Sequence, residues 1–163
     1  MEINMEKEKV LALDADELQR YEPNRYPFLY IDRVTECVPG KYAKGFKNLT
    51  NNEWFFPKHY KGHAFMPAAI QTECLSQMVT VIFTTMPGID CSDVVGSSWS
   101  AKFHKEIVPG DRLEIEAFAK SYTRGVGKGY ARSYVDGELA CEVEVTMVIP
   151  SEFDKYRPRK MQG

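Results

Sequence analysis

The chain has 163 residues, of which 44% are hydrophobic and 27% charged, a composition typical of one globular domain with a sizeable core. Its formal net charge of −2 and pI near 6.0 give no basic surplus, which argues against a nucleic-acid-binding protein. No apolar run approaches the roughly 18–20 residues of a membrane-spanning helix, and the charged start MEINMEKEKV is not a secretory signal.

The four cysteines, Cys37, Cys74, Cys91 and Cys141, have no CxxC spacing. Such cysteines are typical of reduced thiols, and we therefore expect a cytoplasmic protein.

The first half of the chain predicts short elements. A helix is expected at 14–20, with Asp14 or Asp16 as its N-cap. A strand is expected at 28–37, ended by the Pro39-Gly40 turn, and a second extended segment at about 42–50.

One long helix is predicted, from Pro67 to about Thr85. Proline is tolerated at the first helical position because the N–H that it lacks would have no partner there.

The last seventy residues predict an antiparallel meander. Turns are expected at 109–111, 124–129 and 136–137, between strands at 94–107, 111–123, 129–136 and 138–149. The final strand alternates: Cys141, Val143, Val145, Met147 and Ile149 share one face, and Glu142, Glu144 and Thr146 the other. The charged tail, 151–163, is expected to be loosely ordered.

This order of elements predicts an α+β fold in which one long helix lies on an antiparallel sheet. We expect a single domain over 1–163, with its core at about 14–150. A lone helix on an open sheet leaves apolar surface and strand edges uncovered, so self-association is expected.

The stretch KHYKGHAFMPAAIQTECLSQ (58–77) holds two of the three histidines, His59 and His63, four residues apart. On a helix this spacing would place both on one face as zinc ligands. Pro57 and Gly62 argue against a helix, however, and no third ligand stands at a motif spacing. We expect no metal site, and the residues alone are compatible with two surface histidines.

Glu73 is the one carboxylate of the long predicted helix. At about 100° per residue it shares a face with Ser76, Gln77 and Thr80, opposite the apolar residues. This pattern by itself is that of a solvated position.

Three blocks resemble the FabZ-type 3-hydroxyacyl-acyl carrier protein dehydratases: NRYPFLYIDRV (24–34), NNEWFFPKHYKGHAFMPAAIQTECLSQ (51–77) and SAKFHKEIVPGDRLEIE (100–116). The resemblance implies a hot-dog fold, an antiparallel sheet wrapped around a long central helix, which agrees with the layout above. It implies a lyase without a cofactor that acts on an acyl thioester of acyl carrier protein or coenzyme A. It also implies a homodimer, further assembled as a trimer of dimers (a hexamer).

Carried over residue by residue, the family's catalytic histidine falls on His59 and its catalytic acid on Glu73, whereas His63 falls on a variable position. Related dehydratases that also isomerise the double bond have aspartate at the Glu73 position, so glutamate favours dehydration alone. In the family the two groups meet across a dimer interface, which would place Glu73 against a partner chain rather than water.

These residue types suit the reaction. A neutral imidazole can accept the weakly acidic C2 proton, and a protonated carboxyl in an apolar pocket can donate to the leaving hydroxyl. Which group performs which step stays open. The backbone N–H of Ala68, at the start of the helix, would stabilise the thioester oxygen.

The chain departs from the family pattern at two places. Ala68 replaces a glycine, and Tyr60-Lys61 replaces Phe-Pro. These changes would narrow the site, loosen the loop that positions His59 and place a cation near the imidazole.

The acyl chain would need an apolar tunnel, for which the candidates are Phe55, Phe56, Phe65, Met78 and Trp99. An acidic carrier protein would need a basic docking surface, for which the candidates are Lys102, Lys105, Arg124, Lys128 and Arg132. A hot-dog thioesterase, or a catalytically weak acyl-binding or scaffold protein of this fold, remains the alternative function.

Overall fold

The computed structural model describes residues 8–158. All strands belong to one seven-stranded sheet in the order β1-β2-β3-β5-β6-β7-β4, with antiparallel pairing between every pair of neighbours. In chain order the elements are β1 (Leu11–Leu13), α1 (Ala15–Leu18), β2 (Arg33–Val38), β3 (Tyr42–Asn48), α2 (Phe56–His59), α3 (Ala68–Thr84), β4 (Val95–Phe103), β5 (Arg112–Thr123), β6 (Val126–Val135), β7 (Glu138–Val148) and α4 (Pro150–Asp154).

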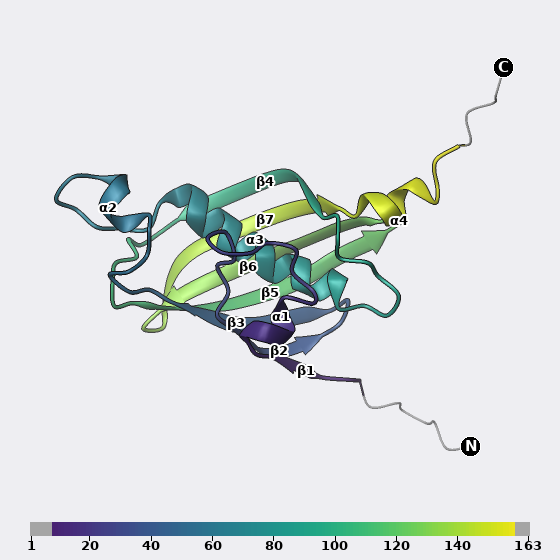
Figure 1. Cartoon of the computed structure of the whole chain (residues 1–163), viewed down its shortest axis with the longest axis horizontal. Helices are drawn as coiled ribbons and strands as arrows, with labels where there is room; N and C mark the ends of the chain where they lie inside the picture. The colour runs from purple at the N-terminus through teal and green to yellow at the C-terminus, as the bar shows by residue number, and fades with distance from the viewer. Residues whose placement is uncertain (1–7, 159–163) are drawn as a thin grey trace.

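The long helix α3 lies across one face of the curved sheet, with α2 and α4 at opposite ends of the molecule (Figure 1). This arrangement confirms the predicted α+β hot-dog layout. Among residues 8–158, no helix is long and apolar enough to cross a membrane.

Helix α3 is buried along most of its length: Gln71 and every residue from Cys74 to Thr84 are buried. The polar residues of the predicted solvated face, Ser76, Gln77 and Thr80, are therefore covered as well. The covering material is other parts of the same chain, because the described residues of the sheet and of the segment before β2 pack around the helix. The polar face of α3 is an internal surface.

Two glycines of β6 allow α3 to approach the sheet closely. A Cβ at Gly129 would lie 2.6 Å from Cγ1 of Val79 and 2.8 Å from the carbonyl oxygen of Phe118. A Cβ at Gly127 would lie 2.9 Å from the ring of Phe83. Both distances are shorter than van der Waals contact, so any larger residue would force helix and sheet apart.

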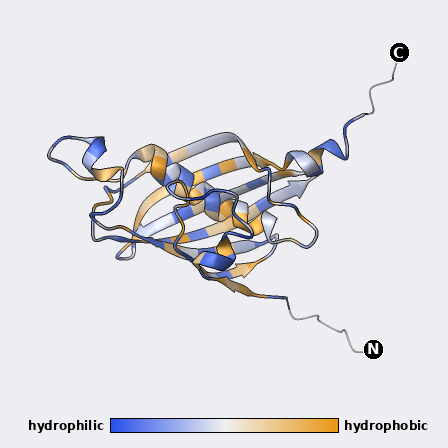
Figure 2. Cartoon of the chain, in the orientation of Figure 1, coloured by the Kyte–Doolittle hydropathy of each residue, from blue (hydrophilic) through white to orange (hydrophobic). Residues whose placement is uncertain are grey.

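The strands follow the predicted alternation. In β7 and just beyond it, Cys141, Val143, Val145, Met147 and Ile149 are buried, whereas Glu142, Glu144 and Thr146 are not. Hydrophobic and hydrophilic residues alternate visibly along the central strands (Figure 2). The sheet therefore has one face against α3 and one polar outer face.

The predicted turn at 124–129 is wrong in length. The turn consists of Arg124 and Gly125 alone, both with positive φ (51° and 79°), and β6 begins at Val126. Asp136 and Gly137 form the corresponding turn between β6 and β7 (49° and 78°). Two consecutive left-handed residues are what a two-residue hairpin turn requires.

The strand predicted at 28–37 is wrong in its first half, because β2 begins only at Arg33. Residues 28–30 run over α3 instead, where the N–H of Tyr30 and the carbonyl of Phe28 bond to the side chain of Gln77. The strand predicted at 94–107 ends at Phe103.

Sequence patterns did not predict α2, β1 or α4. The tail was expected to be loosely ordered from 151, but α4 covers its first residues. Ser151 donates to Asp93 through both its N–H and its hydroxyl (2.9 Å each). Residues 159–163 of that tail lie outside the described residues. Asp14, one of the two predicted caps, is the N-cap of α1.

Replacement of Gly129 tests the close contact between helix and sheet. We expect Gly129→Ala to lower the free energy of unfolding by about 1–3 kcal/mol, because the new methyl group overlaps Val79 and a backbone carbonyl. Urea unfolding measures the change. Lys128→Ala, one residue away on the exposed outer face, should stay within about 0.5 kcal/mol of wild type. Equal losses for the two variants would contradict this account of the contact.

Candidate active site

His59 is the last residue of α2, a single turn anchored by the buried side chains of Phe55 and Phe56. Its ring atom Nδ1 lies 2.9 Å from the carbonyl oxygen of Phe65. A carbonyl only accepts, so in the neutral ring Nδ1 carries the proton and Nε2 has the free lone pair. The half-buried imidazole is therefore held in the tautomer that a general base needs.

Aromatic rings surround the imidazole. The ring centroids of Phe65 and Tyr60 lie 4.2 Å and 4.6 Å from that of His59. Tyr60 and Phe65 also stack on each other, at 5.3 Å with an interplanar angle of 9°. Ring packing thus fixes His59 although Tyr60-Lys61 replaces the Phe-Pro of the family pattern.

His63 has a different environment. Its Nε2 lies 3.0 Å from Oε2 of Glu106, and both side chains are exposed. Tyr60 and His63 form a β-bridge around Gly62, which has a φ of 77°. The two histidines are thus not on one helix, and no group of three or more potential metal ligands occurs among residues 8–158.

Glu73 lies in the second turn of α3 and is half-buried. Nε2 of Gln77 donates to Oε1 of Glu73 (2.9 Å) and to the carbonyl of Phe28 (2.6 Å), while Oε1 of Gln77 accepts from the N–H of Tyr30 (2.9 Å). The amide of Gln77 therefore both orients the carboxylate and attaches the segment before β2 to the helix.

A cavity of about 60 Å³ adjoins Glu73. Its walls come from α3, from residues 22–24 in the segment between α1 and β2, and from strands β4 and β7. Trp99 of β4 closes one side, with its indole N–H donating to the hydroxyl of Ser76 (2.9 Å). His59 is not among the residues that line this cavity, so its wall within one chain contains only one of the two predicted catalytic groups.

Sequence analysis missed Glu22, which also lines this cavity. Its side chain is only 1% exposed. Oε1 accepts from both N–H groups of Asn24, the backbone one at 3.1 Å and the side-chain one at 2.7 Å, while Oε2 has no hydrogen-bond partner among the described residues. Burial raises the pKa of Glu22 from 4.5 to about 7, against the lowering effect of the bonds from Asn24. A carboxylate beside a proline in a polar segment gives no sequence signal of such burial.

Helix α3 begins at Ala68, with Pro67 as its N-cap and no side-chain cap. Ala68 is exposed and lines an open groove of about 370 Å³, together with residues such as Phe65 and Phe103. The first N–H groups of the helix have no intrahelical acceptors and point out of its positive end. Free N–H groups at a helix N-terminus can bind an oxyanion.

The predicted tunnel residues fall into two sets. Phe55, Phe56 and Met78 are buried in the hydrophobic core. Phe65 lies beside His59, and Trp99 is 48% exposed at the cavity beside Glu73.

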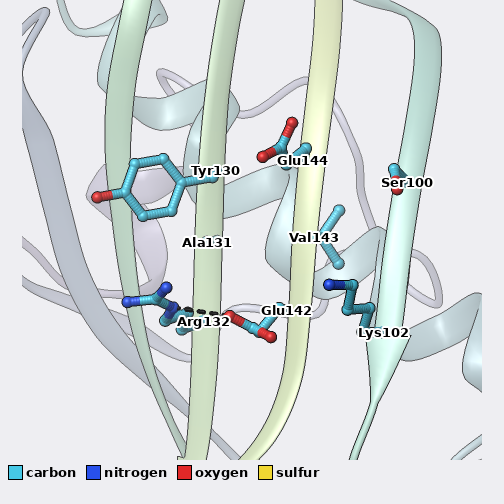
Figure 3. A pocket seen from close by; sticks show the side chains of 8 residues that line it. All are labelled: Ser100, Lys102, Tyr130, Ala131, Arg132, Glu142, Val143 and Glu144. Atoms are coloured by element: carbon cyan, nitrogen blue, oxygen red, sulfur yellow. Dashed lines mark hydrogen bonds and ion pairs between the residues drawn. The ribbon is translucent and has the colours of Figure 1, made fainter.

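The predicted docking cations lie along the outer face and the ends of the sheet. Lys102 and Arg132 flank Glu142 in a hollow of about 290 Å³ on that face, where Arg132 donates to Glu142 at 3.0 Å (Figure 3). Lys105 is bound to Glu138 (2.7 Å), and Arg124 lies over the ring of Tyr156 (5.6 Å). Among residues 8–158, Lys102 and Lys128 have no ion-pair partner within 4.0 Å.

Comparison with known proteins shows the family of the chain. The model of the FabA-like domain matches residues 22–144. The chain belongs to the FabZ-type dehydratases of the FabA-like family. It is 38% identical over 147 residues to a 3-hydroxyacyl-[acyl-carrier-protein] dehydratase FabZ of Desulforamulus reducens, covering 84% of this chain and 97% of that protein. It is 39% identical over 142 residues to the FabZ of Clostridium novyi, covering 85% and 99%.

The fold has a solved counterpart in the dehydratase heterocomplex ApeI:P of Xenorhabdus doucetiae. The TM-score is 0.71 at 12% identity, over 85% of this chain and 95% of that one. The family resemblance predicted from the three sequence blocks is thus confirmed.

The raised pKa of Glu22 makes stability depend on pH. The folded chain keeps the proton up to about pH 7, whereas the unfolded chain releases it near 4.5. Between these values the native state binds more protons, so its free energy of unfolding falls as pH rises. We expect the difference in free energy of unfolding between wild type and Glu22→Gln to change by about 3 kcal/mol from about pH 5 to pH 8. The change favours the variant at high pH.

Urea unfolding at several pH values measures this difference. Asp16→Asn, which removes an exposed carboxylate from α1, should follow the wild-type curve. A constant difference between wild type and Glu22→Gln over this range would mean that Glu22 ionises in the folded chain as it does in water.

Proposed function

We propose that this protein is a hydro-lyase that converts a (3R)-3-hydroxyacyl thioester of acyl carrier protein into the trans-2-enoyl thioester in fatty-acid biosynthesis or a related acyl pathway. The observation that carries the proposal is the orientation of His59: its Nδ1 is bound to the Phe65 carbonyl, so its basic Nε2 is free for a substrate proton. Family membership, together with Glu73 on the central helix, supports the same assignment.

In the proposed mechanism Nε2 of His59 removes a proton from C2 of the acyl group. The electron pair shifts into the thioester, and the N–H of Ala68 stabilises the charge on the thioester oxygen. The C3–O bond then breaks, and the protonated carboxyl of Glu73 donates to the departing hydroxyl, which leaves as water. The proton on His59 returns to Glu73 through solvent, so the protein ends each cycle unchanged.

We further propose that the active site is completed by a second copy of the chain. His59 does not line the cavity beside Glu73 within one chain. Strand β4 is an edge strand of the sheet and exposes three large apolar side chains, Val95 (54%), Trp99 (48%) and Phe103 (46%). Antiparallel pairing of two β4 strands would cover this edge and bring the His59 of one protomer towards the Glu73 of its partner. We also propose that three such dimers assemble into a hexamer.

The proposed carrier surface includes Lys102 and Lys128, which point outward from β4 and β6 and have no acidic partner within the described chain. They are free to pair with the acidic surface of an acyl carrier protein. We also propose a cytoplasmic location, which the four free cysteines support.

Variants at the two catalytic positions test the assignment. We expect His59→Ala and Glu73→Gln each to lower kcat/KM for dehydration by about 10²–10⁴, because each removes a proton-transfer group. The assay follows enoyl formation by absorbance and free thiol with a thiol reagent.

His63→Ala is the matched control, since it removes an exposed histidine four residues away whose side chain bonds to Glu106 and packs on Phe65. It should keep wild-type dehydration. Full activity of His59→Ala would refute the assignment of the base, and release of thiol without enoyl product would indicate a thioesterase.

The dimer is tested by placing like charges on β4. A two-fold pairing centred on Trp99 would place position 95 of one chain opposite position 103 of its partner. We therefore expect Val95→Lys combined with Phe103→Lys to raise the dimer dissociation constant at least about tenfold and to lower activity in parallel. Analytical ultracentrifugation measures the first quantity. Val108→Lys, outside the strand, should remain dimeric, and a wild-type protein that is monomeric and fully active would contradict the proposal.

A further inference from the structure

The cavity beside Glu73 has one polar side, whereas residues such as Val94, Trp99, Val145 and Met147 form an apolar side. Besides Glu73 itself, the polar side includes Glu22, Asn24, Ser76 and Thr80. A pocket for a plain alkyl chain needs apolar walls, because an alkyl group cannot replace the hydrogen bonds that polar groups make with water. The polar side of the cavity therefore suits an occupant that carries a hydrogen-bonding atom as well as carbon.

Glu22 is the least satisfied of these groups. Its Oε1 already accepts two N–H groups of Asn24, at 3.1 Å and 2.7 Å, whereas its buried Oε2 has no partner among the described residues. In the neutral carboxyl the proton thus belongs on Oε2, which then needs an acceptor. The cavity, at about 60 Å³, has room for only about two groups of the size of a water molecule or methylene.

We propose that Glu22 is a specificity-determining residue that donates a hydrogen bond to an oxygen atom in the acyl chain of the substrate. This inference rests on the proposed function, because it takes Glu73 as the group beside the reacting carbons. The preferred substrates would be 3-hydroxyacyl thioesters with an oxygen a few atoms beyond C3. With an alkyl chain of the same length, Oε2 would stay unpaired in the complex, and the enzyme would bind the transition state less tightly.

Burial has the largest effect on the pKa of Glu22 and raises it, whereas the two hydrogen bonds from Asn24 lower it. When Glu73 is ionised, its charge on α3 opposes the ionisation of Glu22, and Arg25, in the same segment as Glu22, favours that ionisation more weakly. Cys91, in the segment between α3 and β4, is the remaining titratable neighbour. The cavity residues from β4 and β7, such as Trp99 and Met147, carry no charge. With burial, these effects raise the pKa of Glu22 to about 7.

The test compares substrates that differ by one atom. The reference is the 3-hydroxyheptanoyl thioester, and its ether analogues are the 3-hydroxy-5-methoxypentanoyl and 3-hydroxy-4-ethoxybutanoyl thioesters. The first has an ether oxygen in place of carbon 6, and the second has one in place of carbon 5. An ether oxygen accepts hydrogen bonds but does not donate them. At about pH 6 we expect wild-type kcat/KM to be at least about fivefold higher for one of the ethers than for the alkyl chain. In Glu22→Leu the ratio of kcat/KM for the ether to kcat/KM for the alkyl chain should fall to one or below.

The pH dependence separates hydrogen bonding from a structural role. Above about pH 7 the ionised Glu22 no longer donates, so the wild-type preference for the ether should disappear by about pH 8.5. Glu22→Gln keeps an N–H donor at every pH and should keep its preference. Because each ratio compares two substrates on one preparation, partial unfolding of a variant cancels. If Glu22→Leu fails to fold, the pH dependence of the ether preference in wild type and in Glu22→Gln still tests the proposal.

The outcomes are distinct. A wild-type ratio no higher than that of Glu22→Leu for both ethers, or a wild-type ratio that does not change with pH, would overturn the proposal and leave Glu22 a structural residue. Absence of enoyl product from all three thioesters would instead reject the proposed dehydratase activity.

Discussion

The side chain of Gln77 joins the central helix to the segment that covers it. One amide accepts the N–H of Tyr30 and donates to the carbonyl of Phe28 and to Glu73. Each of these backbone groups would cost about 1–3 kcal/mol if it were buried without a partner. The polar stripe of α3 can therefore be internal only because these bonds replace water. The same bonds orient Glu73, so the constraint that allows the helix to be buried also positions one of the two proposed catalytic groups.

The fold was predictable where long elements have regular patterns. The run from Pro67 to Thr85 and the alternation of Cys141 to Ile149 each repeat over several turns or residue pairs, so α3 and β7 were found within a residue or two. The single turn α2 and the three-residue β1 have no such repeat. They form because Phe56 inserts into the core and because Leu11 and Leu13 pair with β2, and these tertiary contacts leave no local signal.

The candidate site, like the fold, was predictable only in part. The family motif predicts His59 and Glu73 as the catalytic pair because their chemistry and their order along the chain are recognisable. The helical wheel placed Glu73 correctly beside Ser76 and Gln77, but periodicity alone cannot tell whether a polar face meets water or another polar segment. Glu22 could not be predicted at all. Its burial depends on how the segment before β2 crosses α3, which is a property of the whole fold.

Strand β4 would link the proposed chemistry to the proposed dimer. It is an edge of the sheet, and it also supplies Trp99 to the cavity beside Glu73. In one chain that cavity is bounded by a strand with a free edge, and the indole that closes it is about half exposed. A partner strand paired to β4 would cover this edge and exclude water from the cavity. Exclusion of water strengthens electrostatic interactions at the thioester and makes an unpaired oxygen of Glu22 more costly. Association would therefore raise both the rate of catalysis and the selectivity for the substrate, because both depend on the same wall of the cavity beside Glu73.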